Sequence, residues 1–325
     1  MKPRPPSVAP DGRELRPRAI SLLRSPCDHH DRAYDVVVGV TLYNQAESLG
    51  RCLRSIAWQE VGRLRVAVVL LDDISTDNWV EQLDRCDAPF PFYVLRAECG
   101  SAAQARNALL DWVDVNLPKA HWIARLDADD RFADPASLRE AVLLGNATHA
   151  KYVVGSNRLV RDGRVLNRTN IATDRLRDAE FLVPLLEQMA EGTADNELPS
   201  CNLLLRNHCG WRYPSIGSAE DHWLVSSLLI HEPTRAAILS ESFYCDYSLD
   251  GQSTTNAHRQ EVYYRQRRYI SSAAHAWHDV RQSGRKILGW GQEGIVSRIG
   301  GEIQKRFYPG IIDEGTVKRL KDSLK

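Results

Sequence analysis

Three carboxylates stand close together in the segment Asp127-Ala128-Asp129-Asp130. The preceding residues, 121–126, form a largely apolar run that is typical of a buried strand. Carboxylates grouped at the end of such a strand are costly unless a positive charge compensates them. A divalent cation that prefers oxygen ligands, Mg²⁺ or Mn²⁺, supplies such a charge and commonly also holds a substrate's phosphates. The alternative is an acidic turn before a helix, because Asp134-Pro135 follows at once and Asp is a good N-cap.

Two more polar clusters follow segments with strand character. Residues 35–41 lead into Thr41-Leu42-Tyr43-Asn44, and residues 65–71 lead into Asp72-Asp73. Helical patterns at 49–56 and 101–113 separate the expected strands. This alternation predicts a doubly wound, largely parallel sheet, in which ligands bind beyond the carboxyl ends of the strands. The three clusters together therefore predict a nucleotide site, while the missing GxGxxG and GxxxxGK(S/T) motifs disfavour a dinucleotide fold and exclude a P-loop.

The second half of the chain has a different pattern. Glu220-Asp221 opens an apolar helix, and residues 161–164 predict a hairpin turn. Pro184 is expected to kink or split a long helix. Further strands are expected at 152–156, 200–205, and, as one broken strand, 236–239 with 243–247; the long helix is expected at 173–190, and residues 256–325 are expected to form a helical appendage.

Composition narrows the class of protein. Lys plus Arg and Asp plus Glu number 42 each, so the charge gives no sign of polyanion binding and we expect no nucleic-acid partner. Seven cysteines without a CxxC motif favour a reduced protein in the cytoplasm. No apolar run reaches the roughly 18–20 residues that span a bilayer. Residues 1–33, rich in Pro and Arg, lack the apolar centre of a secretory signal and are predicted to be a mostly disordered leader.

Five motifs follow one another along the chain: Val38-Gly39-Val40-Thr41-Leu42-Tyr43-Asn44, Leu70-Leu71-Asp72-Asp73-Ile74-Ser75-Thr76-Asp77, Ala105-Arg106-Asn107, Leu126-Asp127-Ala128-Asp129-Asp130 and Glu220-Asp221. In this order they resemble the family 2 glycosyltransferases, which have the GT-A fold. The resemblance covers roughly residues 35–255. It implies a mixed, mainly parallel central sheet, a nucleotide-sugar donor and inversion at the anomeric carbon, with Mn²⁺ or Mg²⁺ as the cofactor.

The resemblance assigns a donor site. Thr41 and Tyr43 match positions that line the base and ribose pocket, and Asp73 matches a residue that accepts a hydrogen bond from the base, commonly uracil. Turn capping is the alternative for Asp72 and Asp73. Arg106 matches a position near the nucleotide, and an ordinary exposed helix arginine is its alternative.

The Asp127-Ala128-Asp129 unit corresponds to the family's DxD motif. Asp129 is expected to contact the metal directly, and Asp127 to contact the metal, the ribose or a bridging water. Asp130 is expected either to join them or to cap the next turn.

The acid pair supplies the expected catalytic group. Asp221 is the candidate general base, which removes the acceptor's proton during attack, and Glu220 is expected to contact the acceptor. First-turn acids that complement a helix dipole are the alternative. Gln252 and Ser253 lie in a segment, 247–253, that resembles the family's loop over the diphosphate and are expected to bind phosphate oxygens. A histidine common in that loop is missing here, so a third metal contact stays unassigned.

Two aromatic segments have open interpretations. Residues 211–214 are expected either to stack on a sugar or to pack in the core. Residues 263–269 combine tyrosines with arginines, which is compatible with peripheral membrane contact, although a solvated helix face is favoured. The oligomeric state stays open, with a dimer as one option.

The sequence therefore predicts a leader at 1–33, a GT-A transferase domain at 34–255 and a helical C-terminal part at 256–325. The expected function is metal-dependent, inverting sugar transfer from a nucleotide sugar, of which a UDP-sugar is favoured, to a hydroxyl or amine of a glycan or small molecule. Two alternatives stay open. One is a sugar-phosphate nucleotidyltransferase, and the other is a degenerate protein that binds a nucleotide sugar or a partner.

Overall fold

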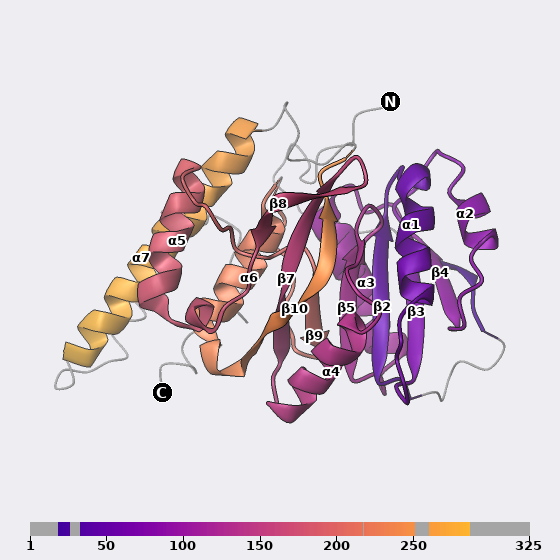
Figure 1. Cartoon of the computed structure of the whole chain (residues 1–325), viewed down its shortest axis with the longest axis horizontal. Helices are drawn as coiled ribbons and strands as arrows, with labels where there is room; N and C mark the ends of the chain where they lie inside the picture. Colours follow the sequence, from indigo (N-terminus) through magenta and orange to yellow (C-terminus); the bar gives the residue numbers. More distant parts are fainter. Residues whose placement is uncertain (1–18, 27–32, 217, 251–259, 287–325) are drawn as a thin grey trace.

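The structure is a computed structural model, and it describes residues 19–26, 33–216, 218–250 and 260–286. One mixed sheet runs through the centre, with helices on both of its faces (Figure 1). Its strands are hydrogen-bonded in the order β1-β4-β3-β2-β5-β9-β7-β10-β6, and β8 pairs with β7. The expected α/β class with a mixed central sheet is confirmed.

Four parallel strands form the first half of the sheet. They are β2 (Val36–Leu42), β3 (Val66–Asp72), β4 (Phe92–Arg96) and β5 (Trp122–Asp127), in the spatial order β4-β3-β2-β5. Their register aligns the polar ends, since Leu42 pairs with Asp72 and Thr41 pairs with Asp127. The three clusters identified in the sequence therefore lie at one edge, as expected for a parallel block.

The other half of the sheet is formed by later strands. β9 (Leu203–Arg206) lies antiparallel to both β5 and β7 (Tyr152–Arg161), and β10 (Ala236–Ser248) lies parallel to β7. The register shifts in β10 between Leu239 and Cys245 match the expected broken strand. β6 (Arg131–Phe132) pairs with β10, and β8 (Arg164–Asn170) forms a hairpin with β7.

The hairpin between β7 and β8 turns through two left-handed residues. Asp162 has φ 49° and Gly163 has φ 72°, as a two-residue hairpin turn requires.

Alternate residues of a strand point to opposite faces of the sheet, so each face packs against its own set of helices. On β2, Val36, Val38 and Val40 belong to one apolar cluster, whereas Val37 belongs to the other. At Gly39 an added Cβ would lie 2.6 Å from a Leu109 side-chain carbon, so the glycine allows the helix that carries Leu109 to pack closely against the sheet.

The first cluster contains residues of α1 (Ala46–Ala57), α2 (Val80–Asp84) and α4 (Ser137–Ala147). The second contains residues of α3 (Ala102–Asn116), α5 (Ala179–Glu191), α6 (Glu220–His231) and α7 (Gln260–Lys286). Pro184 lies within α5, and the short helix η1 (Asp174–Arg177) precedes α5, so the chain is interrupted before the proline. A second short helix, η2 (Pro233–Arg235), leads into β10.

The predicted leader requires a correction. Ser21–Arg24 forms β1, which pairs antiparallel with β4. The physical reason is that β4 would otherwise expose an unpaired strand edge, and β1 satisfies its backbone groups. The prediction of disorder therefore fails for these four residues.

The helix α7 packs into the core. Its Ile270 and Ala274 are buried in the second apolar cluster, and its Arg267 donates hydrogen bonds to Glu197 and to the backbone oxygen of Met189. This arginine belongs to the basic, aromatic segment at 263–269, so part of that segment is internal. The predicted boundary between 255 and 256 lies outside the described residues. Among the helices that the structure describes, none has both the length and the apolar character needed to cross a membrane.

Candidate active site

Asp127, at the end of β5, is held by two arginines and a threonine. Its Oδ2 accepts hydrogen bonds from Arg106 Nη2 at 3.0 Å and Arg125 Nη2 at 2.7 Å. Its Oδ1 accepts from Arg125 Nη1 and, at 3.2 Å, from Thr41 Oγ1. Burial opposes the charged form, but the two guanidinium groups outweigh it and hold the pKa of Asp127 well below its ordinary value. Asp127 is therefore a carboxylate at neutral pH.

Arg106 also reaches the acid pair. Its Nη1 forms an ion pair with Glu220 Oε1, so one guanidinium joins a carboxylate of β5 to a carboxylate of α6. The side chain is buried, which rules out the alternative of an ordinary exposed arginine. Burial and the neighbouring Asp221 raise the pKa of Glu220, while Arg106 opposes this rise.

Tyr213 completes this ionic cluster. The guanidinium carbons of Arg106 and Arg125 lie 5.3 and 5.7 Å from the centre of its ring, within the range of cation–π attraction. Asn107 fixes the tyrosine's backbone through two hydrogen bonds of 2.8 Å, one to its N–H and one to its C=O. Tyr213 and Trp211 are both buried. Of the two interpretations of this segment, packing in the core therefore fits these two rings.

The carboxyl group of Asp129 has a different environment. Burial and the charge of Asp127 raise its pKa to about 6. Oxygens of Asp127, Asp129 and Asp130 all lie within 4.8 Å of one another. An all-carboxylate donor set suits hard cations such as Mg²⁺ and Mn²⁺. The residues therefore fit the expected metal.

Asp130 is directed toward the later strands. It is buried, and its Oδ2 accepts from Asn202 Nδ2 at 2.9 Å while its Oδ1 accepts from the backbone N–H of Ser248 at 2.8 Å. Burial, together with the neighbouring acids, raises the pKa of Asp130. These hydrogen bonds connect the turn after β5 to the loop before β9 and to the end of β10.

Asp72 and Asp73 have separate partners at the end of β3. Asp72 Oδ1 accepts from the Ser75 N–H at 2.8 Å, which is a turn cap. Asp73 Oδ1 accepts from the backbone N–H groups of Cys99 and Gly100, at 2.6 and 3.3 Å. Turn capping thus describes Asp72, and Asp73 fixes the loop between β4 and α3. Its contact with a base stays a prediction.

The loops after β2 and β3 hold each other. Asn44 accepts from the Thr76 N–H at 2.8 Å, and its own N–H donates to Ser75 Oγ at 2.9 Å. Asn44 and Ile74 both have positive φ, at 52° and 48°, a conformation that non-glycine residues adopt only when their surroundings enforce it. Tyr43 lies in the first of these loops.

Asp221 lies in the first turn of α6. Its Oδ2 accepts from Ser200 Oγ at 3.2 Å, and its Oδ1 accepts from the N–H of His222 at 2.8 Å. Burial opposes ionisation, but the neighbouring His222 and Arg106 and this backbone hydrogen bond outweigh it and lower the pKa of Asp221. The group is an ionised carboxylate at neutral pH, as a general base must be.

The structure brings most of the predicted residues together. Contacts join Thr41, Arg106, Asp127 and Glu220 directly, Asp129 and Asp130 lie beside Asp127, and Asp221 follows Glu220. Gln252 and Ser253 lie outside the described residues.

Sequence reasoning missed Arg125 and Ser200. A signal for Arg125 was present, because residues i and i+2 of a strand share one face and a charged residue inside an apolar strand is rarely buried without a partner.

Comparisons with known proteins agree with this geometry. The sequence profile described as "Glycosyl transferase family 2" matches residues 37–209. S. aureus TarS 1-349 in complex with UDP-GlcNAc has a similar fold, with a TM-score of 0.52 and 17% sequence identity over 83% of this chain and 81% of that chain. The same protein in complex with UDP gives a TM-score of 0.51 and 16% identity over 89% and 87% of the two chains. No curated protein sequence matches significantly.

Replacing Arg125 with Met is expected to destabilise the fold. Asp127 would keep Arg106 but lose two of its hydrogen bonds, and breaking a buried ion pair typically costs about 3–5 kcal/mol. Chemical denaturation measures the change. Arg65→Met is the matched control, because it breaks an exposed bidentate pair with Asp35 and should change stability only slightly. Equal effects of the two variants would contradict a buried ionic cluster.

The pKa of about 6 at Asp129 predicts a pH-dependent metal effect. At neutral pH Mn²⁺ should raise the melting temperature, and this rise should shrink as the pH falls through about 6, because protons then compete for the carboxylate. Without metal, the stability of the folded protein should instead rise as the pH falls. The folded pKa lies above the ordinary value of 3.8, so the folded state gains from protonation as the pH falls from about 6 toward 4. Asp129→Asn should remove both trends, and a metal shift that persists at pH 5 would contradict the assignment.

Proposed function

The chain belongs to glycosyl transferase family 2, and we propose that it is a metal-dependent, inverting glycosyltransferase. The donor is a nucleoside-diphosphate sugar, with a UDP-sugar favoured. The acceptor is a hydroxyl or amine of a glycan or small molecule. The transferase domain spans residues 34–255, with α7 packed against it.

One observation carries this proposal. Arg106 is paired with both Asp127 and Glu220, so the carboxylate cluster after β5 and the acid pair of α6 lie on two sides of one guanidinium. Sugar transfer requires this combination, because a leaving diphosphate and an attacking acceptor must meet at one carbon. The two clusters are far apart in sequence. If the acids after β5 only capped a turn, there would be no reason for them to lie beside the acid pair of α6.

The donor side consists of the loops at the ends of β2, β3 and β5. Thr41, Tyr43 and Asp73 hold the base and ribose, and Arg106 lies beside the nucleotide. The fold similarity to a protein solved with UDP-GlcNAc and with UDP supports a uridine nucleotide.

The metal side rests on the DxD turn. Asp129 is the main ligand of a divalent cation. Asp127, which is already paired with two arginines, binds the same cation directly or through a water molecule. Asp130 contributes mainly by fixing the turn. When bound, the cation stabilises the negative charge of the leaving diphosphate. Gln252 and Ser253 are proposed to hydrogen-bond the phosphates.

The acceptor side centres on Asp221. Its carboxylate takes the proton from the acceptor as the acceptor oxygen or nitrogen forms a bond to the anomeric carbon. The bond between that carbon and the diphosphate oxygen breaks on the opposite face, which inverts the configuration. Ser200 and the His222 N–H orient the carboxylate, and Glu220, held by Arg106, contacts the acceptor.

A nucleotide panel tests the donor class. UDP, GDP and dTDP are added with and without Mn²⁺, and the melting temperature is measured for the native protein and for Asp129→Ala. A ligand whose concentration is about 100 times its dissociation constant stabilises the folded protein by roughly 2.7 kcal/mol. We expect a metal-dependent shift with UDP that the variant lacks. No shift with any nucleotide would favour a degenerate binding protein, and pyrophosphate release from a nucleoside triphosphate and a sugar phosphate would favour a nucleotidyltransferase.

Asp221→Asn is expected to separate chemistry from donor binding. The amide cannot accept the proton, so the turnover number should fall about 10²–10⁴-fold, while the affinity for the nucleotide sugar changes little. Steady-state kinetics and calorimetric titration measure the two quantities. Ser200→Ala is the matched control, since it removes one hydrogen bond to the carboxylate and should lower turnover far less. Equal losses of affinity and turnover in Asp221→Asn would contradict the role of a base.

A further inference from the structure

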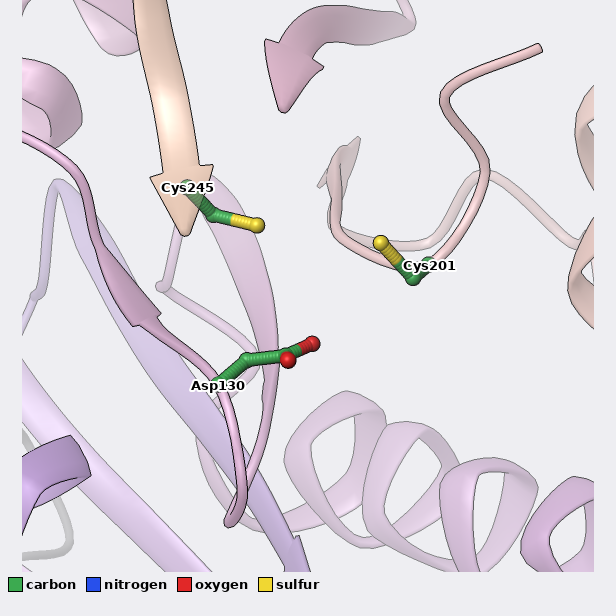
Figure 2. A group of neighbouring side chains, drawn as sticks. All are labelled: Asp130, Cys201 and Cys245. Carbon is green, nitrogen blue, oxygen red and sulfur yellow. The ribbon is translucent and has the colours of Figure 1, made fainter. Parts of the chain in front are cut away.

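A second group of metal-ligating side chains lies behind the DxD turn. A carboxylate oxygen of Asp130 and the sulfur atoms of Cys201 and Cys245 all lie within 4.8 Å of one another. The three residues come from the turn after β5, the loop before β9 and the strand β10, and their side chains point toward one common space (Figure 2). All three are buried.

One amide, that of Asn202, lies near all three ligand atoms, and a second, Asn157 Nδ2, donates to Cys201 Sγ at 3.1 Å. Asn202 Nδ2 lies 2.9 Å from Asp130 Oδ2, 2.7 Å from Cys245 Sγ and 3.4 Å from Cys201 Sγ. An amide has two hydrogens, so it cannot satisfy three acceptors fully. Among the described residues, the buried Oδ1 of this asparagine has no hydrogen-bond partner, which is unusual for a buried polar atom. The Asn202 amide is thus shared among three possible ligands, while its own oxygen has no partner among the described residues.

We propose that Asp130, Cys201 and Cys245 form a site for a thiophilic divalent cation of the Zn²⁺ class. Two sulfurs and one carboxylate oxygen are a donor set that zinc accepts, whereas Mg²⁺ and Mn²⁺ prefer oxygen alone. The site therefore differs in chemistry from the all-oxygen cluster at Asp127 and Asp129, and it does not depend on the proposed sugar transfer.

Binding requires only local rearrangement. Zinc lies about 2.3 Å from sulfur and about 2.0–2.2 Å from carboxylate oxygen, so the three side chains close in around the cation and the Asn202 amide turns aside. Each thiol loses its proton to solvent as its sulfur binds the cation. The fourth position of a tetrahedral site falls to water or to Asn157, whose Oδ1 lies 3.3 Å from Cys245 Sγ.

The site would link three segments beside the proposed active site. Asp130 adjoins Asp129 in the DxD turn, and Cys201 adjoins Ser200, which holds Asp221. A bound cation would fix these segments relative to β10 and stabilise the folded protein by mass action.

Cadmium binding tests the proposal, because Cd²⁺ bound to thiolates has a ligand-to-metal charge-transfer band in the ultraviolet, which oxygen ligands do not give. The reduced full-length protein is titrated with Cd²⁺. We expect a band that saturates at one equivalent and is absent from the double variant Cys201→Ser with Cys245→Ser. Cys86→Ser, at a cysteine outside the cluster, and Asp129→Asn should both keep the band. One equivalent of Zn²⁺ should raise the melting temperature of the native protein but not that of the double variant.

The alternatives are distinguishable. No saturable band in the native protein would overturn the proposal, and so would an unchanged band in the double variant. If the double variant does not fold, Asp130→Asn provides the test, because it keeps the size of the side chain and both thiols. This variant should bind Cd²⁺ at least tenfold more weakly than the native protein, and unchanged affinity would overturn the role of Asp130.

Discussion

The site depends on one buried ionic cluster. Arg106 and Arg125 bring two positive charges to the end of β5, where Asp127 and Glu220 provide the two carboxylates that pair with them. Charges buried in this way are tolerated only if each has a partner of good geometry. The cluster therefore restricts where α3, β5 and α6 can lie relative to one another. It also gives neighbouring acids different environments, because two arginines lower the pKa of Asp127 whereas burial and the charge of Asp127 raise the pKa of Asp129.

The sheet provides the frame for this cluster. Because β2, β3 and β5 are parallel and in register, their polar ends reach the same edge without further adjustment. The antiparallel β9 then brings the chain back beside β5, and the loop that precedes β9 supplies Ser200. The change from parallel to antiparallel pairing thus allows neighbouring strands to supply the proposed nucleotide side and the proposed acceptor side.

Several parts of this arrangement were predictable from sequence. Apolar runs that end in polar clusters imply parallel strands, so the convergence of Thr41, Asp73 and Asp127 follows from general rules of α/β sheets. The link from Asp130 to the Ser248 N–H does not, because it joins residues 118 positions apart through a backbone group with no side-chain signature. Arg125 was overlooked although a signal for it was present. Its spacing from Asp127 and the apolar strand around it indicate a buried, paired arginine, but the sequence does not show that Arg106 shares the same carboxylate.

The packing of α7 has a consequence for the idea of a separable domain. Ile270 and Ala274 fill the same apolar cluster as residues of α5 and α6, and Arg267 satisfies the backbone oxygen of Met189 at the end of α5. A chain shortened at residue 255 would expose that apolar surface to water and leave this carbonyl with the longer hydrogen bond from the Gly192 N–H, at 3.4 Å. The family profile matches residues 37–209, but the hydrophobic core includes residues of α7. The region that matches the family profile and the hydrophobic core therefore have different boundaries in this protein.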